Sequence, residues 1–317
     1  MIVNTQRLFA RLLPRMQIGA VCDVGSMNGA DALTFRDAVP ESSVYAFEPH
    51  PDNFRLMQAN QALQECNIQV VPLAATNYDG EAEFFLVAAS HSERDARRGM
   101  SSLYRRSDEW APAAVVRVKA TRLDTFLADR CPPLVRLALW IDAEGKAYEV
   151  IDGASGVAER VQLLHVEVET SPCIGPNQKL YPQVKALLHR LGFAELATDQ
   201  APSQIQFNAL FVRRDLSARM QFQVNAWLVH ARLRYLIVAV IRRMYRMCVR
   251  RSRSVQFRGS ERAGEAHLAA FFAHTSTFLP KQPCRTASRS LVTGTPTRSY
   301  NRNACNEGGR SVRATSR

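Results

Sequence analysis

Short apolar runs alternate with segments of helical spacing along residues 20–214, and this alternation constrains the fold more than any other feature. The runs 20–25, 43–49 and 134–142 are each followed by a helix-like segment. Units of this kind build a parallel sheet whose two faces are covered by helices. The sequence therefore predicts an α/β domain with a sheet of about seven strands.

The remaining elements follow from the same patterns of spacing and turn residues. Further strands are predicted at 68–75, 81–87, 115–120, 161–169, 194–198 and 205–213. Helices are predicted at 32–39, 51–63, 123–129, 144–154 and 179–193. The turn at 77–80 and the alternating run after it predict a hairpin arm. The long polar stretch 90–112 is typical of either a disordered loop or an active-site lid.

Charge is divided unevenly along the chain. Residues 1–214 hold 22 Lys and Arg against 25 Asp and Glu, a net charge of −3, whereas residues 215–317 hold 19 against 4, a net charge of +15. A nearly neutral body argues against an extended phosphate-binding face, so nucleic acid is not an expected partner. The predicted organisation is an N-terminal helix in 1–19, a domain in 20–214, a basic amphipathic helix in 215–251, and a disordered Arg/Ser/Thr-rich tail in 252–317.

The composition excludes several classes of protein. With 46% hydrophobic and 22% charged residues, the chain is not disordered throughout. The seven cysteines are widely spaced, so they indicate neither a disulfide framework nor a zinc site. The longest purely apolar run near the C-terminus, Leu236 to Ile241, is too short to cross a bilayer, and the first residues lack the apolar core of a signal peptide. The sequence therefore predicts a cytoplasmic protein.

An apolar stripe runs through the basic helix predicted beyond Arg214. Its members follow helical spacing and are Leu233, Leu236, Ile237, Val240, Ile241, Met244 and Cys248. Arginines lie at the edges of this stripe or opposite it. Two interpretations stay open. The stripe packs on the body or in a homodimer, or residues 216–250 lie on an anionic membrane surface with the arginines among the headgroups.

A glycine-bearing turn, DVGSMNG at 23–29, follows the first predicted strand. Such a turn lets a ligand approach the backbone, although it is equally common as a purely structural feature. It is not GxGxxG, because Asp23 occupies the place of the first glycine. A carboxylate there repels a pyrophosphate and favours a cationic or amino-acid-like ligand. The candidate ligand contacts are Asp23, Gly25, Ser26 and Asn28.

Glu48 ends the second predicted strand, about twenty residues after the turn. Nucleoside-binding α/β folds place a carboxylate here to accept both ribose hydroxyl hydrogens. The alternative is a cap for the helix that begins at Pro51. Together with Asp23, Glu48 predicts an adenosyl ligand without phosphates, S-adenosylmethionine (SAM). Further candidate cofactor contacts are Pro49 and Ala75, which lie at the ends of the second and third strands.

Seven blocks occur in order along residues 20–213: VCDVGSMNGAD, VYAFEPHPDNF, VVPLAATNYDGEAEFF, MSSL, TRLDTFL, LWIDAEGKAYEVIDGA and LLHVEVE. In these blocks the chain resembles the FkbM-type SAM-dependent methyltransferases. The resemblance implies a class I methyltransferase fold, which is Rossmann-like. It also implies methyl transfer from SAM to an oxygen, commonly a hydroxyl of a sugar or polyketide.

The resemblance extends to particular residues. Asp23 and Gly25 match the first cofactor motif of the family, and Glu48 matches its ribose-binding acid. The DxEG motif of the family is matched by Asp142, Glu144 and Gly145.

Two positions depart from the family pattern. Ser26 and Met27 follow the first glycine where many relatives have Ala-Asn, and Trp140 stands where many have Lys. The tryptophan removes a candidate catalytic amine, so the resemblance does not identify the general base. The main prediction is a SAM-dependent O-methyltransferase acting on a hydroxylated small molecule or glycan. The alternative is a non-catalytic SAM-binding protein that keeps the same fold.

Asp142 and Glu144 follow the most apolar predicted strand, at the edge where open α/β sheets bind ligands. Asp142 is a candidate to accept the substrate proton, to hydrogen-bond a sugar hydroxyl or to hold a metal, and Glu144 is a second candidate catalytic carboxylate. A local role at the start of the next helix is the alternative for both. These two carboxylates offer only a fragment of the oxygen shell that a divalent cation needs, so no metal is expected.

The next strand and the long loop supply the other candidates. Glu167 and Glu169 lie on one face of their strand and predict contacts to the substrate. His165 shares that face, either as a catalytic base or as an ordinary buried histidine. Ser101 and Ser102 are candidate substrate contacts in the loop, or default turn residues.

Overall fold

A computed structural model describes residues 4–87, 98–106, 112–201, 204–216, 218–220, 222 and 226. Contacts divide the chain into two units, and the helices and strands described below all lie within Met1–Phe222 of the first. The predicted basic helix and tail therefore fall almost entirely outside the described residues. Within the described part, no helix is both long enough and apolar enough to span a bilayer.

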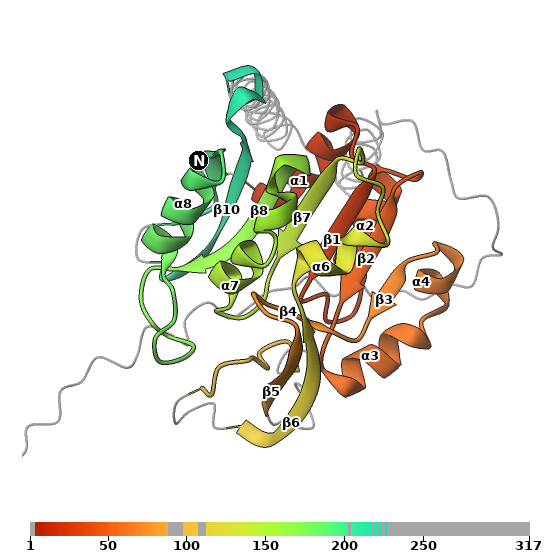
Figure 1. Ribbon diagram of the computed structural model, residues 1–317, viewed down its shortest axis with the longest axis vertical. Helices are drawn as coiled ribbons and strands as arrows, with labels where there is room; N and C mark the ends of the chain where they lie inside the picture. The colour runs from red at the N-terminus through yellow and green to blue at the C-terminus, as the bar shows by residue number, and fades with distance from the viewer. Residues whose placement is uncertain are drawn as a thin grey trace, which may run out of the picture. The chain divides into compact units, whose positions relative to one another are not determined.

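The main sheet has seven strands in the order β3-β2-β1-β7-β8-β10-β9 (Figure 1). Their bounds are β1 Ala20–Val24, β2 Ser43–Phe47, β3 Gln69–Val71, β7 Leu137–Ile141, β8 Val161–Glu169, β9 Phe193–Thr198 and β10 Gln206–Arg213. The first five in this order pair in parallel, and β10 runs antiparallel to both of its neighbours. Every residue of β1 and β7 is buried, as expected for continuous apolar runs at the centre of a parallel sheet. The predicted α/β sheet is confirmed.

A second, three-stranded sheet has the order β4-β6-β5. Its strands are β4 Ala74–Ala75, β5 Gly80–Val87 and β6 Pro112–Thr121. β5 and β6 pair antiparallel and extend below the main sheet in Figure 1. The hairpin predicted at the turn 77–80 is wrong in its pairing, because β4, which precedes the turn, pairs with β6 and not with β5. The single strand expected at 68–75 is instead two short strands, one in each sheet, because Pro72 and Leu73 interrupt the ladder between them.

Helices cover both faces of the main sheet. Their bounds are α1 Thr5–Leu12, α2 Ala30–Ala38, α3 Pro51–Gln58, α4 Gln61–Glu65, α6 Leu123–Ala128, α7 Ala147–Asp152 and α8 Tyr181–Arg190. Apolar residues of α6, α7 and α8 form one core with alternate residues of the strands, and these helices lie on the viewer's side of the sheet in Figure 1. On the other face, Phe9 of α1 and Phe35 of α2 pack against Trp140 of β7. The alternation of strand side chains sets this division.

Candidate active site

The turn after β1 is shaped by a close contact between two stretches of backbone. Gly25 has φ of 83°, and a Cβ atom placed on it would lie 1.9 Å from the carbonyl oxygen of Asp142. Only glycine satisfies both conditions. Before the turn, Asp23 is buried in β1 and accepts a hydrogen bond of 2.6 Å from the Ser26 hydroxyl. The turn therefore lies directly against the residue that follows β7.

Glu48 lies beside this turn and is only 5% exposed. Its carboxylate accepts hydrogen bonds from the backbone N–H groups of Met27 (2.7 Å) and His50 (2.8 Å). Burial raises the pKa of Glu48 to about 7, although these N–H groups, Asn53 and Arg98 oppose the shift. The N-cap of α3 is His50, whose Nδ1 accepts from the Asp52 N–H. The helix thus has a cap other than Glu48.

The other predicted cofactor contacts lie around the same turn or at the end of β4. Asn28 is exposed, and its side-chain oxygen accepts from the N–H of Ala30 at the start of α2 (3.0 Å). Pro49 separates Glu48 from His50, and Ala75 is buried where β4 pairs with β6. Cofactor contacts by these three residues stay predictions.

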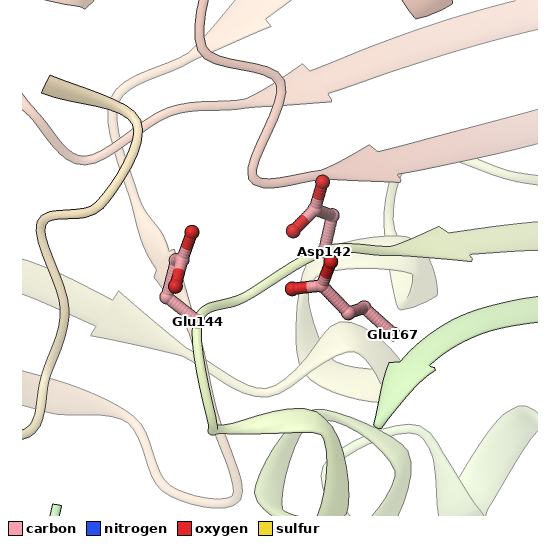
Figure 2. Close-up of side chains that lie close together, drawn as sticks. All are labelled: Asp142, Glu144 and Glu167. Carbon is pink, nitrogen blue, oxygen red and sulfur yellow. The ribbon is translucent and has the colours of Figure 1, made fainter. Parts of the chain in front are cut away.

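Three carboxylates converge at the ends of two neighbouring strands (Figure 2). Asp142 follows β7, Glu144 lies in the loop after it, and Glu167 belongs to β8. One oxygen from each carboxylate lies within 4.8 Å of the other two. Parallel pairing of Ile141 with Val166 brings Asp142 and Glu167 together. We call these three residues the carboxylate cluster; three oxygen ligands of this kind could hold a divalent cation.

The charge of the carboxylate cluster is partly balanced within the protein. Glu144 forms an ion pair with Arg106, and both side chains are largely buried. Burial, together with the charges of Asp142 and Glu144, raises the pKa of Glu167 well above its usual value. The protonated form of Glu167 is therefore favoured beside Asp142.

Two glutamines extend the carboxylate cluster along β8, and the sequence analysis did not identify either. Gln206 donates to Glu167 (2.8 Å) and to Glu169 (3.3 Å), and Gln178 donates to Glu169 (2.6 Å). Burial raises the pKa of Glu169 to about 7. Carboxyl and amide groups therefore form a row on one face of β8. Glu167 and Glu169 were predicted to share this face.

Residues 98–106, which we call the crossing segment, run between β5 and β6 and contact the carboxylate cluster. Ser101 accepts a hydrogen bond from the Val87 N–H (3.1 Å). Ser102 donates to the carbonyl oxygen of Glu144 (2.7 Å) and accepts from the Tyr104 N–H (2.9 Å). Both hydroxyls thus hold the segment in place, and a contact with substrate stays a prediction.

His165 lies in the packing between the sheet and α1. Its ring stacks on Trp140 at 3.6 Å between centroids and an interplanar angle of 1°, and its Nε2 lies 3.1 Å from the Thr5 hydroxyl. Burial lowers the pKa of His165 to about 3, so the ring is neutral. The imidazole is only 1% exposed and is covered by α1. This position favours an ordinary buried histidine over a catalytic base, the two interpretations that the sequence left open. Trp140 is also buried, and its ring packs against Phe9, Phe35 and His165.

The FkbM methyltransferase domain model matches residues 23–194, more than half of the chain. The chain belongs to the FkbM methyltransferase family. The strand order of the main sheet, with antiparallel β10, is the class I methyltransferase order expected for an FkbM protein. The match contains Asp23, Glu48 and the whole carboxylate cluster. No curated protein matches this FkbM chain in sequence.

Solved structures similar to this FkbM chain are distant. The N-terminal domain of EvdMO1, solved in the presence of SAH and D-fucose, has 12% identity, covers 67% of this chain and 81% of its own, and has a TM-score of 0.37. Magnesium protoporphyrin IX methyltransferase (ChlM) from Synechocystis PCC 6803, with bound SAM, has 13% identity, coverages of 66% and 79%, and a TM-score of 0.36. An rRNA methylase from Streptococcus thermophilus has 13% identity, coverages of 67% and 98%, and a TM-score of 0.37. Family membership therefore rests on the domain match.

Proposed function

We propose that this FkbM-family chain transfers the methyl group of SAM to a hydroxyl oxygen of a small-molecule or glycan acceptor. One observation carries the proposal: the Gly25 turn lies against the backbone of Asp142, so the cofactor turn and the carboxylate cluster adjoin. A methyl donor held by the turn and a hydroxyl held at the cluster would thus be neighbours. Proximity of this kind is the main contribution a protein makes to methyl transfer.

The cofactor end favours SAM over a dinucleotide. Asp23 is buried at the turn and Glu48 lies beside it. Two carboxylates at this position disfavour a pyrophosphate. In this proposal Glu48 accepts ribose hydroxyl hydrogens, as the acid at the end of the second strand does in related folds. When bound, SAM supplies an electrophilic methyl group on a sulfonium centre.

The acceptor end favours a hydroxylated molecule. As the C–O bond forms and the S–C bond breaks, the hydroxyl proton must leave, and the Asp142 carboxylate is placed to accept it. The raised pKa of Glu167 favours its protonated form, which can hydrogen-bond to Asp142, while Gln206 holds the Glu167 carboxyl in position. The row of carboxyl and amide groups continues to Glu169, which suits an acceptor with several hydroxyls.

The test is release of S-adenosylhomocysteine (SAH) from SAM in the presence of sugars, polyketides and other hydroxylated acceptors. With an accepted compound, Asp142→Asn should lower kcat by about 10²- to 10⁴-fold while the Kd for SAH stays within about twofold. Asp129→Asn, at the exposed aspartate that caps the C-terminus of α6, is the matched control and should keep full activity. Tight SAM binding with no turnover on any acceptor would support the non-catalytic alternative instead.

A further inference from the structure

Asn53 is a buried amide beside the candidate ribose-binding carboxylate. It lies in the first turn of α3 and is 2% exposed. Its Oδ1 accepts a hydrogen bond of 2.8 Å from Nε of Arg98, which belongs to the crossing segment. A guanidinium Nε–H can only donate, so this bond fixes the oxygen of the amide toward Arg98 and turns Nδ2 the other way.

The Nδ2 group of Asn53 carries two N–H donors, and an interaction with Glu48 uses at most one of them. It is buried and has no hydrogen-bond partner within the part of the chain that the structure describes. A side-chain interaction with Asn53 lowers the pKa of the Glu48 carboxyl, so Nδ2 lies beside that group. Buried N–H groups are nearly always paired in folded proteins, so the remaining N–H of Asn53 beside the candidate ribose-binding carboxylate points to an acceptor on the ligand.

We propose that Asn53 is a second ribose-binding side chain, whose Nδ2 donates to an oxygen of the ribose diol while Glu48 accepts the hydroxyl hydrogens. A hydroxyl group both donates and accepts, and Glu48 can satisfy only the donating half. Asn53 supplies the other half. Arg98 is the positioning residue that keeps the amide in the required orientation. This inference rests on the proposed function, because it takes SAM as the ligand.

Isothermal titration calorimetry with SAH and with its 2′-deoxy and 3′-deoxy analogues tests the inference directly. In the unmodified protein, removal of either hydroxyl should weaken binding by about tenfold or more. In Asn53→Ala, the Kd for SAH should rise by about threefold to tenfold. One of the two deoxy analogues should then bind this variant within about twofold of SAH, because the partner of the missing hydroxyl is already gone.

Arg98 variants separate a binding role from a structural one. Arg98→Met should weaken SAH binding and reduce the preference for the same hydroxyl, since the amide is no longer held. Arg98→Lys should restore part of that preference, because an ammonium group can donate to Oδ1. Arg105→Met removes an exposed arginine from the same crossing segment and should change neither quantity. The preference is a ratio of two Kd values for one preparation, so partial unfolding of a variant does not alter it.

Two outcomes would overturn the inference in distinguishable ways. If Asn53→Ala and Arg98→Met lose the same factor for SAH and both analogues, the effect does not pass through the ribose, and the role of Asn53 is wrong while the proposed function stands. If the unmodified protein binds neither SAH nor SAM, the proposed function fails, and the inference fails with it.

Discussion

Glu48 combines deep burial with a position at the cofactor turn, so its protonation state should control cofactor affinity. Burial raises its pKa to about 7, and only the ionised carboxylate accepts two ribose hydrogens. At pH 6 the protonated form predominates, and at pH 8 the ionised form does. We therefore expect the affinity for SAH to rise between pH 6 and pH 8 in calorimetric titrations.

Two variants check that Glu48 is the group responsible. Glu48→Gln should show weak binding without this pH dependence, and Glu48→Ala should lose about 2–4 kcal/mol of binding free energy. Glu169 also has a pKa of about 7, so Glu169→Gln is the control and should keep the pH dependence. An unchanged profile in Glu48→Gln would remove Glu48 from the cofactor site.

The carboxylate cluster also leads to a prediction about metals. Arg106 pairs with Glu144, and the raised pKa of Glu167 favours its neutral form, so the protein itself reduces the negative charge of the cluster without a cation. We expect methyl transfer to continue after treatment with EDTA, measured as SAH release. Abolished turnover that magnesium restores would contradict this and make Asp142, Glu144 and Glu167 metal ligands.

At the scale of elements, the turn between β1 and α2 is the most tightly constrained connection around the site. Gly25→Ala would combine a left-handed φ with overlap of the Asp142 carbonyl oxygen. It should lower the free energy of unfolding by more than about 3 kcal/mol and weaken SAH binding. Urea denaturation and calorimetry measure the two effects.

Gly80→Ala is the matched control for this prediction. Gly80 also has a positive φ, 143°, but nothing lies within 4 Å of the position a Cβ would take. Its cost should be backbone strain alone, about 1–2 kcal/mol, with unchanged SAH binding. Equal losses in both variants would show that the approach of Asp142 to the Gly25 turn is not the constraint.

The elements differ in how far their sequences reveal them. β1, β2, β7 and β8 are predictable because a strand buried on both faces needs a continuous apolar run. The residues that contact the carboxylate cluster are harder to predict from the sequence. Gln206 reaches Glu167 and Glu169 only through the antiparallel register of β10 with β8, and Arg106 reaches Glu144 only through the path of the crossing segment. Neither path leaves a periodic pattern in the sequence.

At the scale of the whole molecule, charge separates the chain into a nearly neutral body and a basic remainder of net charge +15 beyond residue 214. If the predicted apolar stripe packs on the body or on a second copy, truncation after Arg214 should lower solubility or Tm. Truncation at Ser252 should change neither, since 252–317 has few apolar residues to offset its ordering entropy.

Vesicle binding distinguishes the remaining interpretation of that region. Full-length protein that binds anionic vesicles, and binds them less as salt is raised, would favour a membrane-surface role for residues 216–250. Negligible binding at every salt concentration would agree with packing. A loss of activity or Tm on truncation at Ser252 would show that 252–317 has a structural part.

The order of motifs along the chain revealed the family and the sheet, because each motif sits at the end of a strand whose neighbours the fold dictates. The prediction that the site binds no metal rested on Asp142 and Glu144 alone. Strand order by itself does not show that Glu167 lies close to both of them. Three-dimensional convergence of this kind depends on the register between β7 and β8.

The crossing segment joins two ends of the site through nine consecutive residues. Arg98 contacts Asn53 beside Glu48, and Arg106 contacts Glu144 in the carboxylate cluster. We therefore expect a ligand that moves one arginine to change the environment of the other end. Cofactor and acceptor affinities are then thermodynamically linked, and the factor by which bound SAM changes the Kd of an acceptor equals the factor by which that acceptor changes the Kd of SAM.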